Sequence, residues 1–349
     1  MRRGLISRSP VELPDAVFDA RLDRLRAAMG DARLDALVIY TNNTRPAGVS
    51  WLTGFVPYWS EALLVVPREG LPYLVAALTF RVKTWIERVS RLGDVLHNPR
   101  VGLKAAQQIA SVQKDAAVGI VDFDNLPVGI AGDMREGGPE LMLSDASAPF
   151  AKLRSKADPA EIALSSKAAA IAHRALKQAE GVTLNAMIAE VEREARRLGA
   201  EEIYIAAAPD LVRSPHFTRI EGEATLSESF ALRATVAYKG VWVRLVRAFG
   251  KPAIVQEAAV RFAQAVAQLP SEQGFAGFDT WLVEGCRLAQ PLEPLMGSRL
   301  QRANPPSVGA LASVQGTLTV DGRRVPVGAP VLLGASGEAA SLLINPLYQ

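Results

Sequence analysis

The sequence is poor in residues that form disulfides or bind metals, with one cysteine, Cys286, and three histidines among 349 residues. A single cysteine excludes an intrachain disulfide, and this favours a cytoplasmic protein. No apolar run is long enough to cross a bilayer, so we expect no membrane partner. The first residues are basic, but Pro10, Glu12 and Asp15 follow where a signal peptide would have its apolar core, and we expect no such signal.

The sequence also carries little excess charge. Its formal net charge is +3, and the Lys and Arg residues are scattered rather than gathered into one run. A nucleic-acid-binding protein usually has a basic stripe with aromatic residues between, so we expect no nucleic-acid partner. Hydrophobic residues make up 49% and charged residues 21% of the chain. This balance is typical of a folded globular protein, and the length allows two domains, each with its own core.

Helix and strand patterns alternate over residues 1–147, which predicts an α/β domain. Apolar residues at helical spacing predict a helix over 16–30, with Asp15 as its N-cap. The turn at 68–70 between two apolar runs predicts a hairpin. The other expected elements are strands at 34–40, 61–67, 72–75 and 117–122 and a helix at 79–89.

Residues 145–150 are small and polar and include a proline, which predicts a linker between two domains. After it, Asp158 and Pro159 predict the start of a helix over 160–180. The remaining expected elements of an α+β domain over 148–349 are a helix at 183–198 capped by Thr183, strands at 202–207, 229–237 and 241–248, and a hairpin turn at Gly240.

Five segments share their order and spacing with the motifs of one known family. They are WLTGF (51–55), LRSKADPAEI (153–162), GVT (181–183) with Glu190 and Ala195, SPH (214–216), and YKG (238–240) through Arg247. The chain thus resembles the creatinase/prolidase family over residues 20–250. The resemblance implies a creatinase-like N-terminal domain (1–147), a pita-bread C-terminal domain (148–349) shortened at its C-terminal end, and a homodimer.

The resemblance also predicts where a metal site would lie. Peptidases of this family bind two cations through two aspartates, one histidine and two glutamates. Here the aspartate positions fall at Arg233 and Arg244, and guanidinium groups have no lone pair to donate. No histidine follows His216, and the glutamate positions fall near Gln315 and Gly328. We therefore expect no metal, no other cofactor and no metallopeptidase activity.

Strand alternation predicts that residues replacing the aspartates point into the same pocket. Arg233, Arg244 and also Arg247 would then make this pocket positive, and a small anion such as a carboxylate or phosphate could bind there. The alternative is internal pairing, which we favour slightly for Arg247, because buried guanidinium groups are costly when unpaired. The carboxylates available for such pairing are Glu221, Glu223, Glu228 and Glu284.

His216 is the candidate catalytic residue. It matches the histidine that acts as general base in creatinase, the metal-free branch of the family that hydrolyses an amidino C–N bond. Imidazole suits that role near neutral pH. The alternative is an ordinary loop or core histidine. Creatine is not the expected substrate, because Val246 stands where creatinase has a carboxylate that binds it.

Other candidates carry less weight. Tyr238, Trp242 and Tyr204 could line a pocket, although aromatic residues on strands usually belong to the core. Cys286 could be reactive beside an arginine, but a small buried thiol is the simpler interpretation. We expect the remaining histidines, His97 and His173, to be surface residues.

Two hypotheses for function remain. In the first, the chain is a metal-independent, creatinase-like enzyme that hydrolyses a C–N bond of a small anionic substrate, with His216 as acid and base. In the second, it is a non-catalytic pseudo-peptidase that binds a small molecule or short peptide in the inherited cleft. The histidine favours the first hypothesis, and the lost metal ligands favour the second.

Overall fold

The computed structural model describes residues 9–43, 45, 47–57, 60–180, 183–218, 222, 224–269, 271–285, 308–334 and 339–344. The chain divides into two compact units, Arg2–Arg154 and Ser155–Gln349. The linker predicted at 145–150 is wrong, because this segment holds the end of a strand and the start of helix α6 (Ser147–Leu153). Small residues with a proline are as typical of a first helical turn as of a linker.

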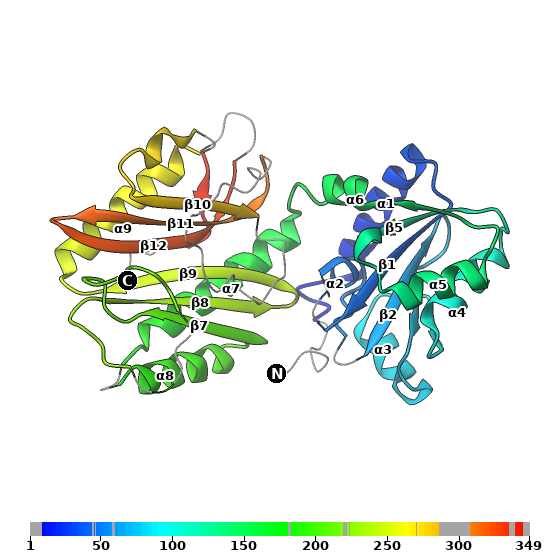
Figure 1. The fold of residues 1–349 in the computed structure, drawn as a ribbon, viewed down its shortest axis with the longest axis horizontal. Helices are drawn as coiled ribbons and strands as arrows, with labels where there is room; N and C mark the ends of the chain where they lie inside the picture. Colours follow the sequence, from blue (N-terminus) through cyan, green and yellow to red (C-terminus); the bar gives the residue numbers. More distant parts are fainter. Residues whose placement is uncertain are drawn as a thin grey trace. The chain divides into compact units, whose positions relative to one another are not determined.

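The N-terminal domain contains a sheet of six strands in the order β4-β3-β2-β1-β5-β6 (Figure 1). β1, β2 and β3 pair antiparallel, whereas β4, β5 and β6 join their neighbours in parallel. The strands are β1 (Ala36–Asn42), β2 (Glu61–Pro67), β3 (Tyr73–Ala76), β4 (Asp94–His97), β5 (Ala117–Val121) and β6 (Met142–Asp145). The predicted α/β class and the predicted hairpin are confirmed.

Helices cover both faces of this sheet, so its central strands are buried on both sides. Leu37 and Ile39 belong to one apolar cluster, while Ala36 and Val38 belong to the other. Alternating side chains of β1 therefore serve two separate cores. The helices are α1 (Asp15–Asp31), α2 (Ala47–Thr53), the short η1 (Phe80–Val82), α3 (Lys83–Val89), α4 (Val101–Ala110), η2 (Phe123–Asn125), α5 (Val128–Gly137) and α6.

Two local features show how the sequence directs this domain. The helix predicted at 16–30 is confirmed as α1, but Asp15 is its first residue and Pro14 is the N-cap, without a side-chain cap. The WLTGF motif ends α2, where Gly54 has φ +76°. Glycine adopts this left-handed conformation without strain, and it lets Phe55 turn into the core with 1% of its surface exposed.

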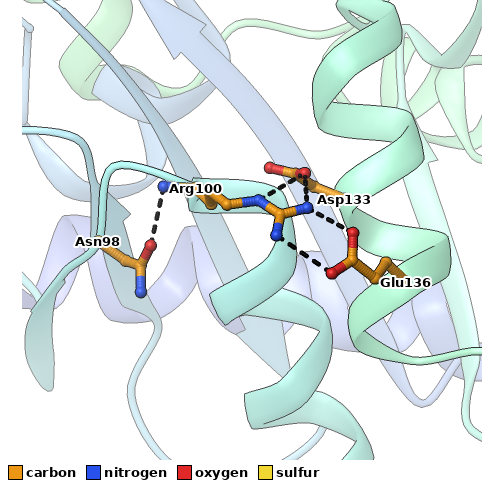
Figure 2. A network of polar contacts seen from close by, with 4 residues as sticks. All are labelled: Asn98, Arg100, Asp133 and Glu136. Atoms are coloured by element: carbon orange, nitrogen blue, oxygen red, sulfur yellow. Dashed lines mark hydrogen bonds and ion pairs between the residues drawn. The ribbon is translucent and has the colours of Figure 1, made fainter.

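An ion-pair network on the surface joins α4 to α5 (Figure 2). The Arg100 guanidinium donates to the carboxylate of Asp133 from Nε at 3.0 Å and to Glu136 from Nη1 at 3.1 Å. The backbone N–H of Arg100 donates to Oδ1 of Asn98 at 2.8 Å and so orients the first turn of α4. Because Arg100 is exposed, solvent screens this network and its stabilisation is small.

The C-terminal domain contains a second sheet, in the order β10-β11-β12-β9-β8-β7, with β13 paired to β12 (Figure 1). Helix α7 packs on β8 and β9, α9 packs on β11 and β12, and α8 packs on α7 and β7. The predicted α+β class is confirmed. The elements are α7 (Pro159–Lys177), α8 (Leu184–Arg197), β7 (Glu202–Ala208), β8 (Phe230–Tyr238), β9 (Val241–Phe249), α9 (Pro252–Ala267), η3 (Glu272–Phe275), β10 (Thr280–Gly285), β11 (Leu311–Val320), β12 (Arg323–Leu332) and β13 (Ser341–Leu342).

Side-chain caps determine where the first two helices of this domain begin. Asp158 accepts from the backbone N–H of Glu161 and Glu161 returns the bond, so α7 starts with a capping box followed by Pro159. Thr183 caps α8 by accepting from Ala186 N–H, without a reciprocal bond. The predicted helix start at Asp158 and Pro159 and the predicted Thr183 cap are confirmed. Among the described helices of the chain, none is long and apolar enough to cross a membrane.

The two halves of the C-terminal sheet meet at β9 and β12. There Val246 of β9 pairs with Gly328 of β12. β8 and β9 pair along their whole length through the turn Lys239–Gly240, whose φ values of +47° and +85° fit a type I′ hairpin.

Candidate functional site

Four positions that the resemblance assigns to metal ligands lie on one face of the C-terminal sheet. Arg233 pairs with Val246, Val246 with Gly328, and Gly328 with Gln315, so these residues form one row across β8, β9, β12 and β11. Arg244 precedes Val246 by two residues on β9 and shares its face. We call the face that carries Arg233, Arg244 and Gln315 the front face, and the opposite face, against α7 and α9, the helix face.

Arg244 pairs with one of the four carboxylates considered from the sequence. Its Nη1 donates to Oε2 of Glu284 on β10 over 2.8 Å. The side chains of Arg244 and Glu284 are 17% and 29% exposed, so solvent screens this pair only in part. Glu228 is exposed, and Glu221 and Glu223 lie outside the described residues. Internal pairing is therefore the outcome for Arg244.

Arg233 contacts a neutral amide and an aromatic ring. Its Nη1 donates to Oε1 of Gln315 at 3.2 Å, and its Cζ lies 4.7 Å from the ring centroid of Phe217. Gly328 leaves room for this contact, because a Cβ there would lie 2.9 Å from both Gln315 Cγ and Val246 Cγ2. The sequence reasoning placed Gln315 near the pocket but did not foresee that it would hold Arg233.

The two aromatic candidates lie on different faces. Trp242 shares the front face, is 7% exposed, and stacks on Tyr204 with ring centroids 5.9 Å apart. The Tyr204 hydroxyl donates to Oε2 of Glu202 at 3.2 Å. Tyr238 lies on the helix face, where Lys167 Nζ of α7 is 4.5 Å from its ring centroid. Trp242 therefore stays a candidate for the front-face site, whereas the register separates Tyr238 from it.

Arg247 lies on the helix face, which corrects the expectation that it joins Arg233 and Arg244. It follows Arg244 by three residues, and an odd spacing along a strand reverses the direction of the side chain. Burial lowers the pKa of Arg247. Its Cζ lies 5.3 Å from the ring centroid of Phe249. Within the described part of the chain no carboxylate pairs with it, so the internal ion pair favoured for Arg247 is not observed.

His173 is buried, with 8% of its surface exposed, so the prediction of a surface residue is wrong. It lies on the side of α7 that also carries Ala169 and Leu176, both fully buried against the sheet. Burial, and then the positive charges of Arg247 and Lys177, lower the pKa of His173. The imidazole is therefore neutral at physiological pH.

His216 lies in the loop that precedes the bridge between Thr218 and Ala207 of β7. Its side chain is exposed, and its backbone N–H donates to Oγ of Ser214 at 3.2 Å. The next residue, Phe217, is the one that contacts Arg233. The loop thus brings His216 to the neighbourhood of the front face, and its catalytic role stays a prediction. Cys286 lies outside the described residues.

A buried carboxylate that the sequence reasoning missed lies beside the β8–β9 turn. Glu201 is 10% exposed, and burial raises the pKa of its carboxyl to about 7. Lys239 Nζ, 3.7 Å away, and the backbone N–H groups of Lys239 and Gly240 act in the opposite direction. Burial outweighs these contacts because the lysine lies beyond hydrogen-bonding distance.

The donor set of the front face does not fit a divalent cation. Guanidinium groups occupy two of the positions, an amide the third, and a glycine without any side chain the fourth. Divalent cations require oxygen or nitrogen donors with free lone pairs, mostly carboxylates and imidazoles. Across the residues that the structure describes, no group of three or more His, Cys, Asp and Glu could hold a metal ion.

Comparison with known proteins agrees with this architecture. The family model of the creatinase/prolidase N-terminal domain matches residues 21–156. This match covers most of the N-terminal domain. No curated protein sequence matches the chain closely enough to count as a relative.

Solved structures extend the creatinase/prolidase likeness to both domains. The prolidase from Pyrococcus horikoshii OT3 is 16% identical with a TM-score of 0.66, and the match covers 93% of this chain and 97% of that one. The X-Pro aminopeptidase from Thermotoga maritima MSB8 is 15% identical with a TM-score of 0.70, covering 92% and 96%. The prolidase from Thermococcus sibiricus is 19% identical with a TM-score of 0.68, covering 94% and 97%. The chain therefore has the creatinase/prolidase fold, with a pita-bread C-terminal domain.

Proposed function

We propose that this chain is a metal-independent, hydrolase-like enzyme that binds a small anionic substrate on the front face and cleaves a C–N bond in it. The observation that supports this proposal is the row of Arg233, Gln315 and Gly328 at positions assigned to carboxylate ligands. Guanidinium groups there favour an anion over a cation. The prolidases and aminopeptidase of similar fold are, by name, enzymes that act on peptides.

Within this site we assign anion binding to Arg233. Arg244 donates to Glu284, and the role we assign to it is to hold that carboxylate on the front face. Arg233 donates from Nη1 to Gln315 and lies over the ring of Phe217, and these two contacts restrict the orientation of the guanidinium. A guanidinium held in this way can bind a carboxylate through two parallel hydrogen bonds. Trp242 and Tyr204 would pack against the apolar part of the substrate.

His216 would supply the acid–base chemistry. It takes a proton from water as the water oxygen attacks the carbon of the C–N bond, and then returns a proton to the departing nitrogen. The result is one bond to oxygen formed, one bond to nitrogen broken, and a histidine in its starting state. The exposed position of His216 next to Phe217 is compatible with a substrate whose anionic end lies on Arg233.

The test uses dipeptides and small amidino- and ureido-carboxylates as substrates, with EDTA in every assay. We expect His216→Asn to lower kcat by about 10²- to 10⁴-fold, the usual contribution of acid–base catalysis. His97→Asn, which alters an exposed histidine of β4, is the control and should leave kcat unchanged. Arg233→Met should raise KM for anionic substrates, and Arg261→Met on α9 is its control. Full turnover by His216→Asn would contradict the assignment.

A second candidate function is a non-catalytic protein that binds a small molecule or short peptide. The Arg244–Glu284 pair favours it, because one of the two arginines is already neutralised within the protein. In that case the same compounds would bind saturably but no product would form. Arg233→Met would lower the affinity for them. The homodimer implied by the resemblance also stays a prediction, which sedimentation velocity would test.

A further inference from the structure

A cavity of about 450 Å³ lies on the helix face of the C-terminal sheet. Residues of β9 and β12 form one wall of it, and α7 and α9 form the other walls. Its lining includes Arg247, His173, Leu176, Phe249, Phe262 and Val327. Arg233 and Arg244 point to the opposite face of the sheet, so this cavity is separate from the front-face site.

The cavity combines two basic nitrogen groups with an apolar wall. Arg247 comes from β9 and His173 from α7, and the positive charge of Arg247 acts on the imidazole. Lys177, also on α7, adds a further positive charge. On the described elements that line this cavity, no Asp or Glu side chain faces Arg247. A half-buried guanidinium without a counter-charge is energetically costly, and a bound anion removes this cost.

The histidine is an independent observation that also indicates a ligand. His173 is 8% exposed and lines the cavity, and its side chain makes no hydrogen bond to another described residue. Its ring nitrogens are not fully buried, so within the cavity they are open to a ligand or to water. An anion between Arg247 and His173 would accept from both side chains at once.

The rest of the lining restricts the chemistry of the ligand. Leu176, Phe262 and Val327 have no polar side-chain group, whereas Gln256 of α9 adds one amide, and the ring of Phe249 lies against the Arg247 guanidinium. A fully hydrated anion such as inorganic phosphate would leave these walls without a partner. A carboxylate with an apolar body can bind Arg247 and His173 with its charged end and pack against the apolar wall with the rest. The volume of the cavity is in the range of sites for small organic ligands.

We propose that this cavity binds a small carboxylate with an apolar body, with Arg247 and His173 on the carboxylate and Phe249 and Phe262 against the apolar part. The ligand class is that of arylalkanoic and short aliphatic acids. The proposal does not depend on the function assigned to the front face.

The experiment compares 3-phenylpropanoate with its uncharged analogue 3-phenylpropanamide by isothermal titration calorimetry. We expect the carboxylate to bind saturably and the amide to bind about 10- to 100-fold more weakly, the usual effect of a charge-assisted hydrogen bond. Arg247→Met should lower the affinity for the carboxylate by the same factor. Equal binding of the two compounds, or no saturable binding of the carboxylate, would overturn the proposal.

Two further variants locate the ligand. Ala259→Phe fills the apolar end of the cavity from α9 and should abolish binding, whereas Ala267→Phe, at an exposed position of the same helix, should not. This pair decides the question if Arg247→Met does not fold. In Arg233→Met, which removes the anion site proposed for the front face, saturable binding of the carboxylate in the cavity should persist. If Arg233→Met weakens binding and Arg247→Met does not, the carboxylate binds on the front face and the cavity proposal is wrong.

A spectroscopic readout separates a bound anion from a structural effect. The imidazole of His173 can be followed by its Cε1–H resonance and assigned with His173→Gln. A carboxylate beside it should raise its pKa, because the anion stabilises the imidazolium ion. An unchanged His173 titration in saturating 3-phenylpropanoate would show that the ligand does not contact this residue, and would overturn the proposal.

Discussion

Arg244 on β9 and Glu284 on β10 form an ion pair of 2.8 Å across the front face of the C-terminal sheet, although β12 and β11 lie between their strands. The resemblance assigns a metal-binding aspartate to the position of Arg244. A fixed cation that is part of the chain thus pairs with a carboxylate where a metal ion would otherwise be expected. This relationship connects the two halves of the sheet, which meet at the pair of Val246 with Gly328.

We expect this pair to stabilise the domain measurably. A double-mutant cycle with Arg244→Met, Glu284→Gln and both together should give a coupling free energy of about 1–3 kcal/mol, since the pair is only partly exposed. Urea unfolding followed by circular dichroism measures the coupling. The exposed pair of Arg193 with Glu190 on α8 is the matched control and should give about 0.3–0.5 kcal/mol. Equal values for the two pairs would contradict this expectation.

Metal removal should have no effect on stability. Protein purified without chelator should contain no stoichiometric Mn, Co, Fe or Zn by elemental analysis. A cation present at 100 times its Kd would stabilise the fold by about 2.7 kcal/mol, so binding would be visible in thermal unfolding. We therefore expect the same Tm in EDTA and in excess Mn²⁺. Two metal equivalents, or a higher Tm with Mn²⁺, would show that the front face binds cations after all.

Glu201 should make the C-terminal domain less stable as the pH rises from about 4.5 to about 7. Its pKa is raised from 4.5 to about 7 in the folded protein, so the folded state binds the proton more tightly than the unfolded state in this window. Glu201→Gln removes the titration. The variant should gain about 1–3 kcal/mol relative to the wild type between pH 5 and pH 8.

The measurement for Glu201 is chemical denaturation of both proteins at several pH values. Lys239 stabilises only the ionised carboxylate, so its contribution belongs to the pH-dependent difference between the two proteins. Glu202→Gln, at the neighbouring position of β7, is the control, because it shows whether removing any buried carboxylate changes the pH profile in the same way. Parallel pH profiles of the wild type and the Glu201→Gln variant would mean that the pKa of Glu201 is the same in the folded and unfolded states, and would contradict this prediction.

Protonation of His173 should lower the free energy of unfolding as the pH falls below about 6.5, above the range in which ordinary carboxylates titrate. Its pKa lies below 6.5 in the folded state, so the unfolded state binds more protons and stability falls as the pH drops below about 6.5. The slope is at most about 1.4 kcal/mol per pH unit for one proton. His173→Gln should flatten the profile between pH 6.5 and 5, whereas His97→Gln should not. Identical slopes in the three proteins would contradict the burial of a neutral imidazole.

Elements with strong local signals could be predicted from the sequence. Asp158 and Pro159 marked the start of α7, and Thr183 marked the start of α8, because caps depend on residues close in the chain. The turn at Lys239–Gly240 was predictable for the same reason, since positive φ at two successive residues favours glycine. The linker predicted at 145–150 failed because its composition is also that of a first helical turn.

The partners of the arginines could be predicted only as a set of alternatives. Glu284 was one of four carboxylates considered for Arg244, and nothing local to β9 distinguishes it from the others. Gln315, which holds Arg233, comes from a strand that the sequence reasoning did not identify. The burial of His173 depends on which side of α7 faces the sheet, and this is decided by packing.

By itself, the sequence determined the class of both domains, the caps and turns of the first half of the C-terminal domain, and the absence of carboxylates at the aspartate positions. These follow from residue identity and from contacts within a few residues. The tertiary structure alone decided that Arg244 pairs with Glu284, that Arg233 is held by Gln315, and that Arg247 lies with His173 on the other face. The reason is that strand register and helix packing join residues far apart in the chain, and a shift of one position along a strand reverses the face of every side chain.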